Sequence, residues 1–328
     1  GATMRLWTYS DSCNMKHEGC CAESAVEDAR RVCDKLGIDF YVMNFKDMFK
    51  DKVVDYFVDE YIHGRTPNPC IACNKYLKFD ALLKKALAMG IDYVATGHYA
   101  KIEKGEDGKY ILRASEAVKK DQSYVLYNFT QEQLAHTLMP LGGYNKDWVR
   151  QKAEELGLGV AHKPDSQEIC FVEDDDYAKF ITDYSGYKPK EGDILDVNGN
   201  VIGKHRGLIY YTIGQRKGIG AYGRPMFVMK IDAENNTITL GEKGMEFSNE
   251  LTAYDVNFVS GEFPKENMLI TAKVRYQAPP AAAMLCPQKD GTVKLMFPEP
   301  QRAVTPGQAV VLYDGEYVLG GGTIIADK

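Results

Sequence analysis

The chain has 328 residues, of which 45% are hydrophobic and 26% are charged, and its formal net charge is −6. This length suffices for two or three domains with separate cores, and eight cysteines are too few for a disulfide scaffold. No stretch approaches the roughly 18–20 apolar residues that a membrane span requires, and no signal peptide is visible, so we expect a cytoplasmic protein without a membrane partner. The negative net charge argues mildly against nucleic-acid binding, which would depend on local basic patches.

Helical and strand patterns alternate in the first half of the chain. Amphipathic helical patterns cover residues 22–36, 48–61 and 77–89. Short apolar runs at residues 40–43 and 93–96 are typical of buried strands. Helices of this length between short strands predict a parallel, doubly wound α/β sheet, in which ligands bind at the carboxyl ends of the strands.

The pattern changes after about Phe171, where short strands and hairpin dipeptides begin. The dipeptides are Asn198-Gly199, Asn235-Asn236, Asp290-Gly291 and Asp314-Gly315. Residues 270–277 alternate between apolar and polar side chains, as in a half-buried strand. These features predict a small β-rich domain followed by a β-barrel. We expect domains at residues 1–172, 173–245 and 246–328.

The first of two cysteine motifs reads Asn68-Pro69-Cys70-Ile71-Ala72-Cys73-Asn74. Prolines keep the chain extended up to Cys70, and a helical pattern starts near Asn74, so both thiols should lie near a helix N-terminus. The helix dipole lowers the pKa of a thiol there and favours the thiolate, which is the nucleophile and metal ligand. The alternative is a packed or zinc-bound pair, for which Cys20 and Cys21 could supply the other two ligands.

The second motif reads Asp165-Ser166-Gln167-Glu168-Ile169-Cys170-Phe171. A lone cysteine is more often a packing residue, but the polar neighbours of Cys170 favour a site. Together with Cys13, Cys20 and Cys21, the thiols of the first motif suggest metal binding or redox activity in a reducing compartment. Read together, the two motifs indicate sulfur transfer.

Several polar strings accompany these motifs. Thr96-Gly97-His98-Tyr99 follows an apolar strand, where Gly97 would let a ligand approach the backbone. The other strings are Lys119-Lys120-Asp121-Gln122-Ser123-Tyr124, Gly214-Gln215-Arg216-Lys217-Gly218, Arg275-Tyr276 and Pro306-Gly307-Gln308. Each alone is typical of a solvated surface, whereas several together, with aromatics interleaved, suit RNA backbone contacts and base stacking.

At these motifs the sequence closely resembles the tRNA-specific 2-thiouridylases. The matching strings run in order along essentially the whole chain: Gly64-Arg65-Thr66-Pro67-Asn68-Pro69, Cys73-Asn74-Lys75, Ala95-Thr96-Gly97-His98-Tyr99, Lys120-Asp121-Gln122-Ser123-Tyr124, Asp165-Ser166-Gln167-Glu168-Ile169-Cys170-Phe171, Tyr211-Thr212-Ile213-Gly214-Gln215-Arg216-Lys217-Gly218 and Thr305-Pro306-Gly307-Gln308. The resemblance implies an adenine-nucleotide hydrolase-like α/β domain and an ATP- and magnesium-dependent sulfurtransferase. Such an enzyme adenylates the C2 oxygen of the wobble uridine in tRNA and replaces that oxygen with sulfur.

The resemblance also implies residue roles. Cys170 matches the cysteine that carries the persulfide sulfur, which a cysteine desulfurase or sulfur-relay protein supplies. Cys73 matches the nucleophile that frees hydrosulfide from the persulfide or closes a disulfide with Cys170. The target base would lie against Asn68, Pro69 and Cys70, and the adenine nucleotide against Met4 and Gly97. The matching tRNA-contact positions are His98, Lys120, Asp121, Gln122, Arg275, Tyr276 and Gln308.

The sequence departs from the family pattern in two respects. The family carries a Ser-Gly-Gly-x-Asp-Ser loop that holds the ATP pyrophosphate, and no such string is present. We therefore expect an N-terminally incomplete α/β domain, with ATP binding badly impaired in the chain as given. Secondly, Cys70 stands where many relatives carry Asp, so Cys70, Cys73 and Cys170 could hold a [4Fe–4S] cluster with one iron open. The alternatives are thus the same reaction through that cluster, or a non-catalytic tRNA- or zinc-binding protein.

Overall fold

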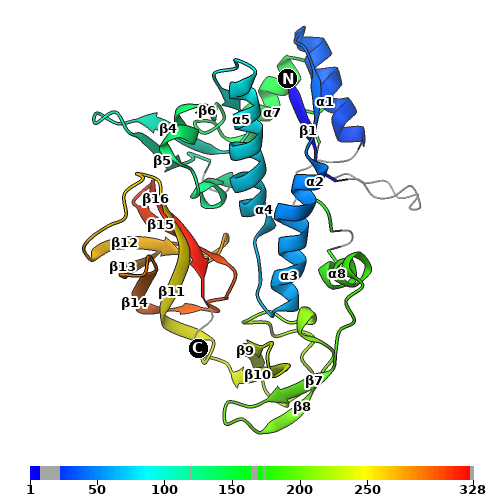
Figure 1. The fold of residues 1–328 in the computed structure, drawn as a ribbon, viewed down its shortest axis with the longest axis vertical. Coiled ribbons are helices and arrows are strands. Elements are labelled where there is room, and N and C mark those ends of the chain that lie inside the picture. The colour runs from blue at the N-terminus through cyan, green and yellow to red at the C-terminus, as the bar shows by residue number, and fades with distance from the viewer. Residues whose placement is uncertain (8–22, 118–119, 164–168, 173–174, 326–328) are drawn as a thin grey trace.

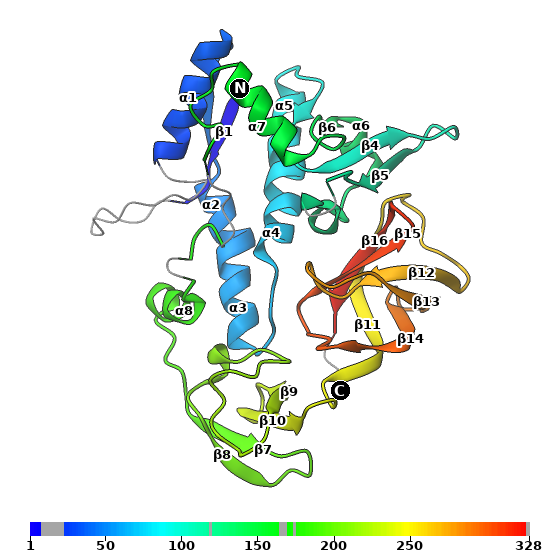
Figure 2. The same ribbon diagram turned by 180° about the vertical axis from the view of Figure 1, so that it is seen from behind.

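The computed structural model describes residues 1–7, 23–117, 120–163, 169–172 and 175–325. Two long helical segments lie side by side through the middle of the molecule, with a β-barrel beside them and a smaller sheet at one end (Figure 1). The opposite view shows the same arrangement, with the first strand at the far end from the smaller sheet (Figure 2). Among the described residues, no helix has the length and hydropathy that a membrane-spanning helix needs.

The α/β part contains parallel strand pairs, as the alternating patterns predicted. Strand β1 (Ala2–Arg5) pairs in parallel with β2 (Tyr41–Asn44), and β3 (Val94–Ala95) pairs in parallel with β6 (Thr137–Leu138). The helices of this part outside the central pair are α1 (Glu23–Leu36), α6 (Gln131–Ala135) and α7 (Lys146–Glu155). The parallel strands with their helices confirm the α/β class, and these four strands form two separate two-stranded sheets.

The first central helical segment covers residues 46–62 and the second covers residues 69–88. The first consists of α2 (Lys46–Phe49), a π-helical stretch (Lys50–Asp55) and α3 (Tyr56–Ile62). The second, called the thiol helix below, consists of α4 (Pro69–Ala72), a π-helical stretch (Cys73–Ala81) and α5 (Leu82–Ala88). The predicted start of this helix near Asn74 is wrong. The helix begins at Pro69, because a proline fits the first helical position, where its missing N–H costs nothing.

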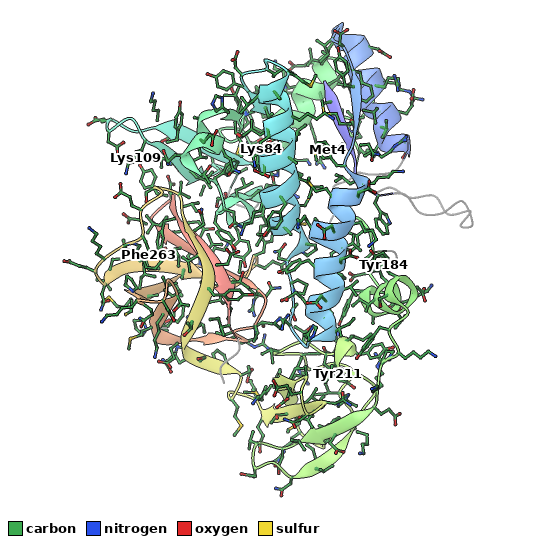
Figure 3. The ribbon with its side chains drawn as sticks, in the orientation of Figure 1. Met4, Lys84, Lys109, Tyr184, Tyr211 and Phe263 are labelled. Carbon is green, nitrogen blue, oxygen red and sulfur yellow. The ribbon has the colours of Figure 1, made fainter. Side chains whose placement is uncertain are left out.

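The middle part is a four-stranded sheet in the order β8-β7-β10-β9. Its strands are β7 (Gly192–Leu195), β8 (Val201–His205), β9 (Met226–Asp232) and β10 (Thr237–Glu242), with α8 (Tyr177–Ser185) before them. The turns at Asn198-Gly199 and Asn235-Asn236 join β7 to β8 and β9 to β10, as predicted. Tyr184 of α8 lies against the first helical segment (Figure 3), where its hydroxyl donates a hydrogen bond to Asp55.

The last part is the expected barrel. Its strands are β11 (Phe247–Phe258), β12 (Met268–Lys273), β13 (Ala281–Pro287), β14 (Val293–Arg302), β15 (Ala309–Asp314) and β16 (Tyr317–Ile324). They run in the order β11-β14-β13-β12-β15-β16, and pairing of β11 with β16 closes the barrel. The strand predicted over residues 270–277 ends at Lys273, because the chain turns where the Ala278 N–H bonds to the Arg275 carbonyl.

A hairpin of the α/β part extends the barrel sheet. Strands β4 (Ala100–Lys104) and β5 (Tyr110–Ala114) form the hairpin, and β5 pairs with β16 at Arg113 and Tyr317. The tip of the hairpin reaches toward the barrel loop that carries Phe263 (Figure 3), where Lys109 Nζ lies 2.6 Å from Glu262 Oε1. This hairpin was not predicted from the sequence, although Asp107-Gly108 at its turn is the same signal that located the later hairpins.

The thiol helix lies between two apolar cores. One, called the helix core, joins the two helical segments and includes Cys73, Leu77, Phe57 and Phe171. The other, called the shared core, joins the thiol helix and the hairpin to the outer face of the barrel. Its members include Ile71, Phe79, Ala100, Leu112, Tyr124, Phe129, Ala309, Val311, Tyr313 and Val318. Separate clusters fill the barrel and the middle sheet.

The shared core should make the α/β part and the barrel stabilise each other. Leu112 is 0% exposed in this core, whereas Leu269 on the barrel surface is 79% exposed. We expect Leu112→Ala to lower the free energy of unfolding by about 2–5 kcal/mol, through lost burial and a cavity. The matched variant Leu269→Ala should change it by less than about 0.5 kcal/mol. Urea unfolding followed by circular dichroism measures both, and equal losses would contradict the interdomain core.

Candidate functional site

The first motif forms a capped helix start. Asn68 has an extended backbone, and its Oδ1 accepts hydrogen bonds from the N–H groups of Cys70 at 3.1 Å and Ile71 at 3.3 Å. Pro69 occupies the first helical position, and the thiol-bearing Cys70 is exposed next to it. The expected thiol at a helix N-terminus is therefore present, with the cap satisfying amides that would otherwise be unpaired.

Cys73 lies one turn further along and is only 8% exposed. It is the first residue of the π-helical stretch of the thiol helix. The next residue, Asn74, is buried and donates from Nδ2 to the Val125 carbonyl oxygen at 3.1 Å, which ties the thiol helix to the hairpin side of the molecule. The arrangement thus holds an inner thiol at Cys73 and an outer thiol at Cys70.

The Cys170 segment is held by its aromatic neighbour. Phe171 is 1% exposed, and its ring makes edge contacts with Phe49 and Phe57 at centroid distances of 5.7 and 5.2 Å. Cys170 is half-buried and packs against the helix core, to which Cys73 also belongs. Two thiols from distant parts of the sequence therefore border one apolar cluster. The polar string 165–168 lies outside the described residues.

The structure does not support the cluster of three thiols. Among the described residues, no three His, Cys, Asp or Glu side chains are grouped closely enough to hold a metal ion. Cys70, Cys73 and Cys170 are all described, so they do not form the ligand set that a [4Fe–4S] cluster needs. Cys13, Cys20 and Cys21, which entered the zinc alternative, lie outside the described residues.

The two positions expected at the adenine nucleotide lie on different strand pairs. Met4 is on β1, where it packs against the helix core, and Figure 3 shows it beside the thiol helix. Gly97 is exposed just beyond the carboxyl end of β3. A Cβ at Gly97 would meet only Leu141, at an ordinary 3.7 Å, so internal packing does not explain the glycine. The open backbone there fits the close approach of a flat group.

His98 has an unusual environment for a residue expected to contact RNA. Its Nδ1 lies 2.9 Å from Thr96 Oγ1, and its ring is 5.5 Å from that of Phe79. Burial, with a smaller contribution from the Lys78 ammonium, lowers the pKa of His98 to about 3. The imidazole is therefore neutral at physiological pH, so it can serve as a hydrogen-bonding or stacking group but not as a cation.

The loop at residues 120–122 is strongly structured. Asp121 Oδ1 accepts hydrogen bonds from the N–H groups of Ser115 and Ser123 at 3.0 and 3.2 Å. Gln122 Oε1 accepts from the Tyr99 N–H at 3.0 Å. These contacts give Asp121 and Gln122 a role in shaping the loop beside Lys120, whereas Lys119 lies outside the described residues. Whether the loop also contacts tRNA stays a prediction.

Tyr276 connects the barrel to this loop. Its hydroxyl donates to the Asp121 carbonyl oxygen at 3.0 Å. Burial is the largest cause of the raised pKa of Tyr276, and the charges of Asp121, Lys120 and Cys70 also act on its hydroxyl. Arg275 lies beside it, with Nη1 3.3 Å from the Arg302 carbonyl oxygen. The turn that ends β12 therefore brings Tyr276 to the loop at residues 120–122, whereas Arg275 is held against the barrel at Arg302.

The side chain of Gln308 is hydrogen-bonded to the backbone before the thiol helix. Its Nε2 donates to the carbonyl oxygens of Thr66 at 2.8 Å and Pro67 at 3.3 Å. A nearby ion pair was not predicted from the sequence: Arg65 Nε lies 2.9 Å from both carboxylate oxygens of buried Glu60. No local pattern marks this pair, although Arg65 stands in the string that carried the family resemblance.

A cavity of about 340 Å³ lies between the helical segments and the barrel. Asn68 is in its lining, but neither Cys70 nor Cys73 is. The Lys75 ammonium bridges the cavity wall to Asp255 of β11 at 2.6 Å. The cavity therefore adjoins the helix start without containing the thiols.

Three family models match the chain, one for each part of the fold. Residues 1–174 match the tRNA methyl transferase HUP domain, residues 178–242 match the tRNA methyl transferase PRC-barrel domain, and residues 248–324 match the aminomethyltransferase beta-barrel domain. The order of the matches is that of the α/β part, the middle sheet and the barrel.

The chain is also similar over nearly its full length to curated proteins named tRNA-specific 2-thiouridylase MnmA. The relative from Acetivibrio thermocellus is 57% identical over 327 residues, which are 99% of this chain and 91% of that protein. The relative from Clostridioides difficile is 56% identical over 99% of this chain and 90% of that protein. The relative from Clostridium beijerinckii is 54% identical with the same coverage.

The neutral state of His98 can be measured directly. In ¹³C-histidine NMR spectra, assigned with His98→Gln, the His98 signal should not titrate between pH 5 and 8, whereas histidine in the urea-unfolded chain should titrate near about 6.5. Because the folded pKa lies below the unfolded one, the unfolded chain takes up the proton first. The stability that neutral His98 contributes should be complete above about pH 6.5 and decline as the pH falls toward about 3. A His98 midpoint above pH 5 would contradict the burial argument.

Proposed function

We infer that this chain is a tRNA-uridine 2-sulfurtransferase, because it belongs to the tRNA-specific 2-thiouridylase family. Its substrate is the wobble uridine of tRNA, whose C2 oxygen is replaced by sulfur at the expense of ATP. The observation that carries the proposal for the site is the capped start of the thiol helix. There Cys70 is exposed and Cys73 is buried, and Tyr276 of the barrel is hydrogen-bonded to the loop at residues 120–122.

The proposed chemistry uses the two thiols that border the helix core. A sulfur donor, for which we propose a cysteine desulfurase or a relay protein, leaves a persulfide on Cys170. The Cys73 thiolate attacks the Cys170 sulfur, so that hydrosulfide leaves and a Cys73–Cys170 disulfide forms. The hydrosulfide then adds at C2 of the activated uridine and AMP departs with the oxygen. In the other order the persulfide adds to C2 first, and Cys73 then releases the thiolated base by closing the same disulfide.

The shared location of Cys73 and Cys170 supports the role of Cys73 as the resolving thiol. Cys73 belongs to the helix core, against which Cys170 packs. Cys70, in contrast, lies at the exposed first turn, where Asn68 and Pro69 would line the target base. A uridine turned out of its stack could enter at this turn, at the cost of unstacking.

ATP would supply the activating adenylyl group, with magnesium on its phosphates. Exposed Gly97 beyond β3 and half-buried Met4 on β1 fit contacts to the adenine nucleotide. The 328 residues contain no Ser-Gly-Gly-x-Asp-Ser string for the pyrophosphate. We therefore propose assaying these residues both alone and joined to a segment that carries this string, so that weak ATP binding is separated from a failure of sulfur transfer.

Both proposed sulfur-handling thiols should be essential. We expect Cys73→Ser and Cys170→Ser each to lower the rate of tRNA thiolation at least about a thousandfold, because serine neither carries a persulfide nor attacks sulfur. The measurement is transfer of ³⁵S into unmodified tRNA with ATP and a cysteine desulfurase, compared with the same assay without ATP. Cys286→Ser, on β13 of the barrel, is the matched control and should keep the wild-type rate. Retained thiolation in either of the first two variants would reject the assigned roles.

Cys70 separates the persulfide relay from cluster chemistry. Cys70→Asp should retain thiolation, because the resemblance places Asp at this position in many relatives and the relay does not use the Cys70 sulfur. A cluster held by three thiols would lose one ligand in this variant, and aspartate is a poor iron–sulfur ligand. Loss of thiolation in Cys70→Asp, together with iron in anaerobically purified wild-type protein, would overturn the relay in favour of the cluster.

A further inference from the structure

The segment at residues 64–67, called the junction segment, is where all three parts of the fold meet. Thr66 Oγ1 lies 3.5 Å from Thr212 Oγ1 of the middle part, and the Thr66 N–H donates to the Pro306 carbonyl oxygen of the barrel at 2.9 Å. On its own side, Arg65 is held by Glu60 through both its backbone N–H and its guanidinium. The base-facing turn of the thiol helix begins directly after this segment.

Gln308 makes the central contact of the junction. Its side-chain amide donates to the carbonyl oxygens of both Thr66 and Pro67, and an amide nitrogen has two hydrogens to give. Both donors are therefore used within the protein. The two acceptors are carbonyl oxygens, which fixes the orientation of the amide and leaves only its oxygen for any other partner.

The barrel holds Gln308 rigidly. Its carbonyl oxygen accepts from the Ile324 N–H at 2.8 Å, and its own N–H bonds to Thr305 at 3.1 Å. Neighbouring Gly307 has a φ of +86°, and a Cβ there would lie 3.0 Å from the Thr66 nitrogen and 3.1 Å from Glu60 Oε2. Only glycine allows the turn to approach the junction segment this closely. The turn that carries Gln308 is thus built to meet residues 65–67.

A shift in the position of Thr66 would move the thiols by a similar amount, because the backbone between them is stiff. Pro67 and Pro69 have fixed φ angles, and each also restricts the residue before it, so the four residues from Thr66 to Pro69 have few free rotations. Asn68 lies between the prolines and caps the helix through the Cys70 N–H. The position of the Thr66 and Pro67 carbonyls therefore sets the position of the helix start.

We propose that Gln308 is a positioning residue of the thiolation reaction, which holds the Thr66 and Pro67 carbonyls and thereby places the Asn68–Cys70 turn relative to the barrel. The inference rests on the proposed function for its kinetic consequence, but not for its structural one. It assigns Gln308 a task different from the tRNA contact expected from the family resemblance. The barrel turn that carries Gln308 would then lie at a fixed distance from the thiols.

The structural arm of the test uses the protein without tRNA or ATP. Gln308→Leu keeps the side-chain size but removes both donors, and Gln308→Glu places a carboxylate against the two carbonyls. In either variant, hydrogen exchange of the Thr66 and Cys70 amides should be about five- to tenfold faster, while amides of β13 and β14 stay unchanged. Gln288→Leu is the matched control, since its Nε2 also donates to a barrel carbonyl, that of Cys286 at 2.9 Å. Unchanged exchange at Thr66 would overturn the proposal.

The kinetic arm separates positioning from RNA contact. We expect Gln308→Leu to lower kcat for thiolation about ten- to a hundredfold at saturating tRNA, with KM for tRNA within about twofold of wild type. A raised KM with unchanged kcat would assign Gln308 to tRNA binding and overturn the positioning role. If the protein does not thiolate tRNA either alone or joined to a segment that carries the Ser-Gly-Gly-x-Asp-Ser string, the proposed function fails. The exchange measurement still decides whether Gln308 holds the helix start.

Discussion

Burial of the thiol helix on two flanks is the constraint on which the rest of the molecule depends. Cys73 and Leu77 face the helix core, and Ile71 and Phe79 face the shared core. A helix fixed on both sides cannot rotate or slide without opening a cavity in one core, which costs several kcal/mol. The reactive thiol therefore has one position, and the other side chains of the proposed site must reach that position from other parts of the fold.

Two of the rings expected at the site are uncharged near pH 7. Burial lowers the pKa of His98 to about 3 and raises the pKa of Tyr276. Such groups recognise a base through stacking and hydrogen bonds more than through charge. This agrees with the negative net charge of the chain. Because of that charge, only a few local cations can attract RNA over long distances.

Local signals in the sequence were sufficient for much of the fold, and their failures have physical causes. Hairpin dipeptides such as Asn198-Gly199 specify their turns by backbone geometry alone, so they located the strands correctly. The start of the thiol helix was misjudged because a proline can end one segment or begin the next, and only the Asn68 cap decides which. The contacts of Gln308 with Thr66 and Pro67 join residues 241 and 242 positions apart, and no local pattern can report such a pair.

The barrel is one continuous segment of the sequence, but because of the shared core it depends on the α/β part for its stability. Val311 and Val318 on its outer face pack against Leu112 and Tyr124 of the α/β part, and β5 adds to its sheet at Tyr317. Expressed by itself, the barrel would expose an apolar patch and part of an unpaired strand edge to solvent, and both features promote aggregation. Recombination between relatives should accordingly succeed when the hairpin at residues 100–114 travels with the barrel, and fail when a crossover separates them.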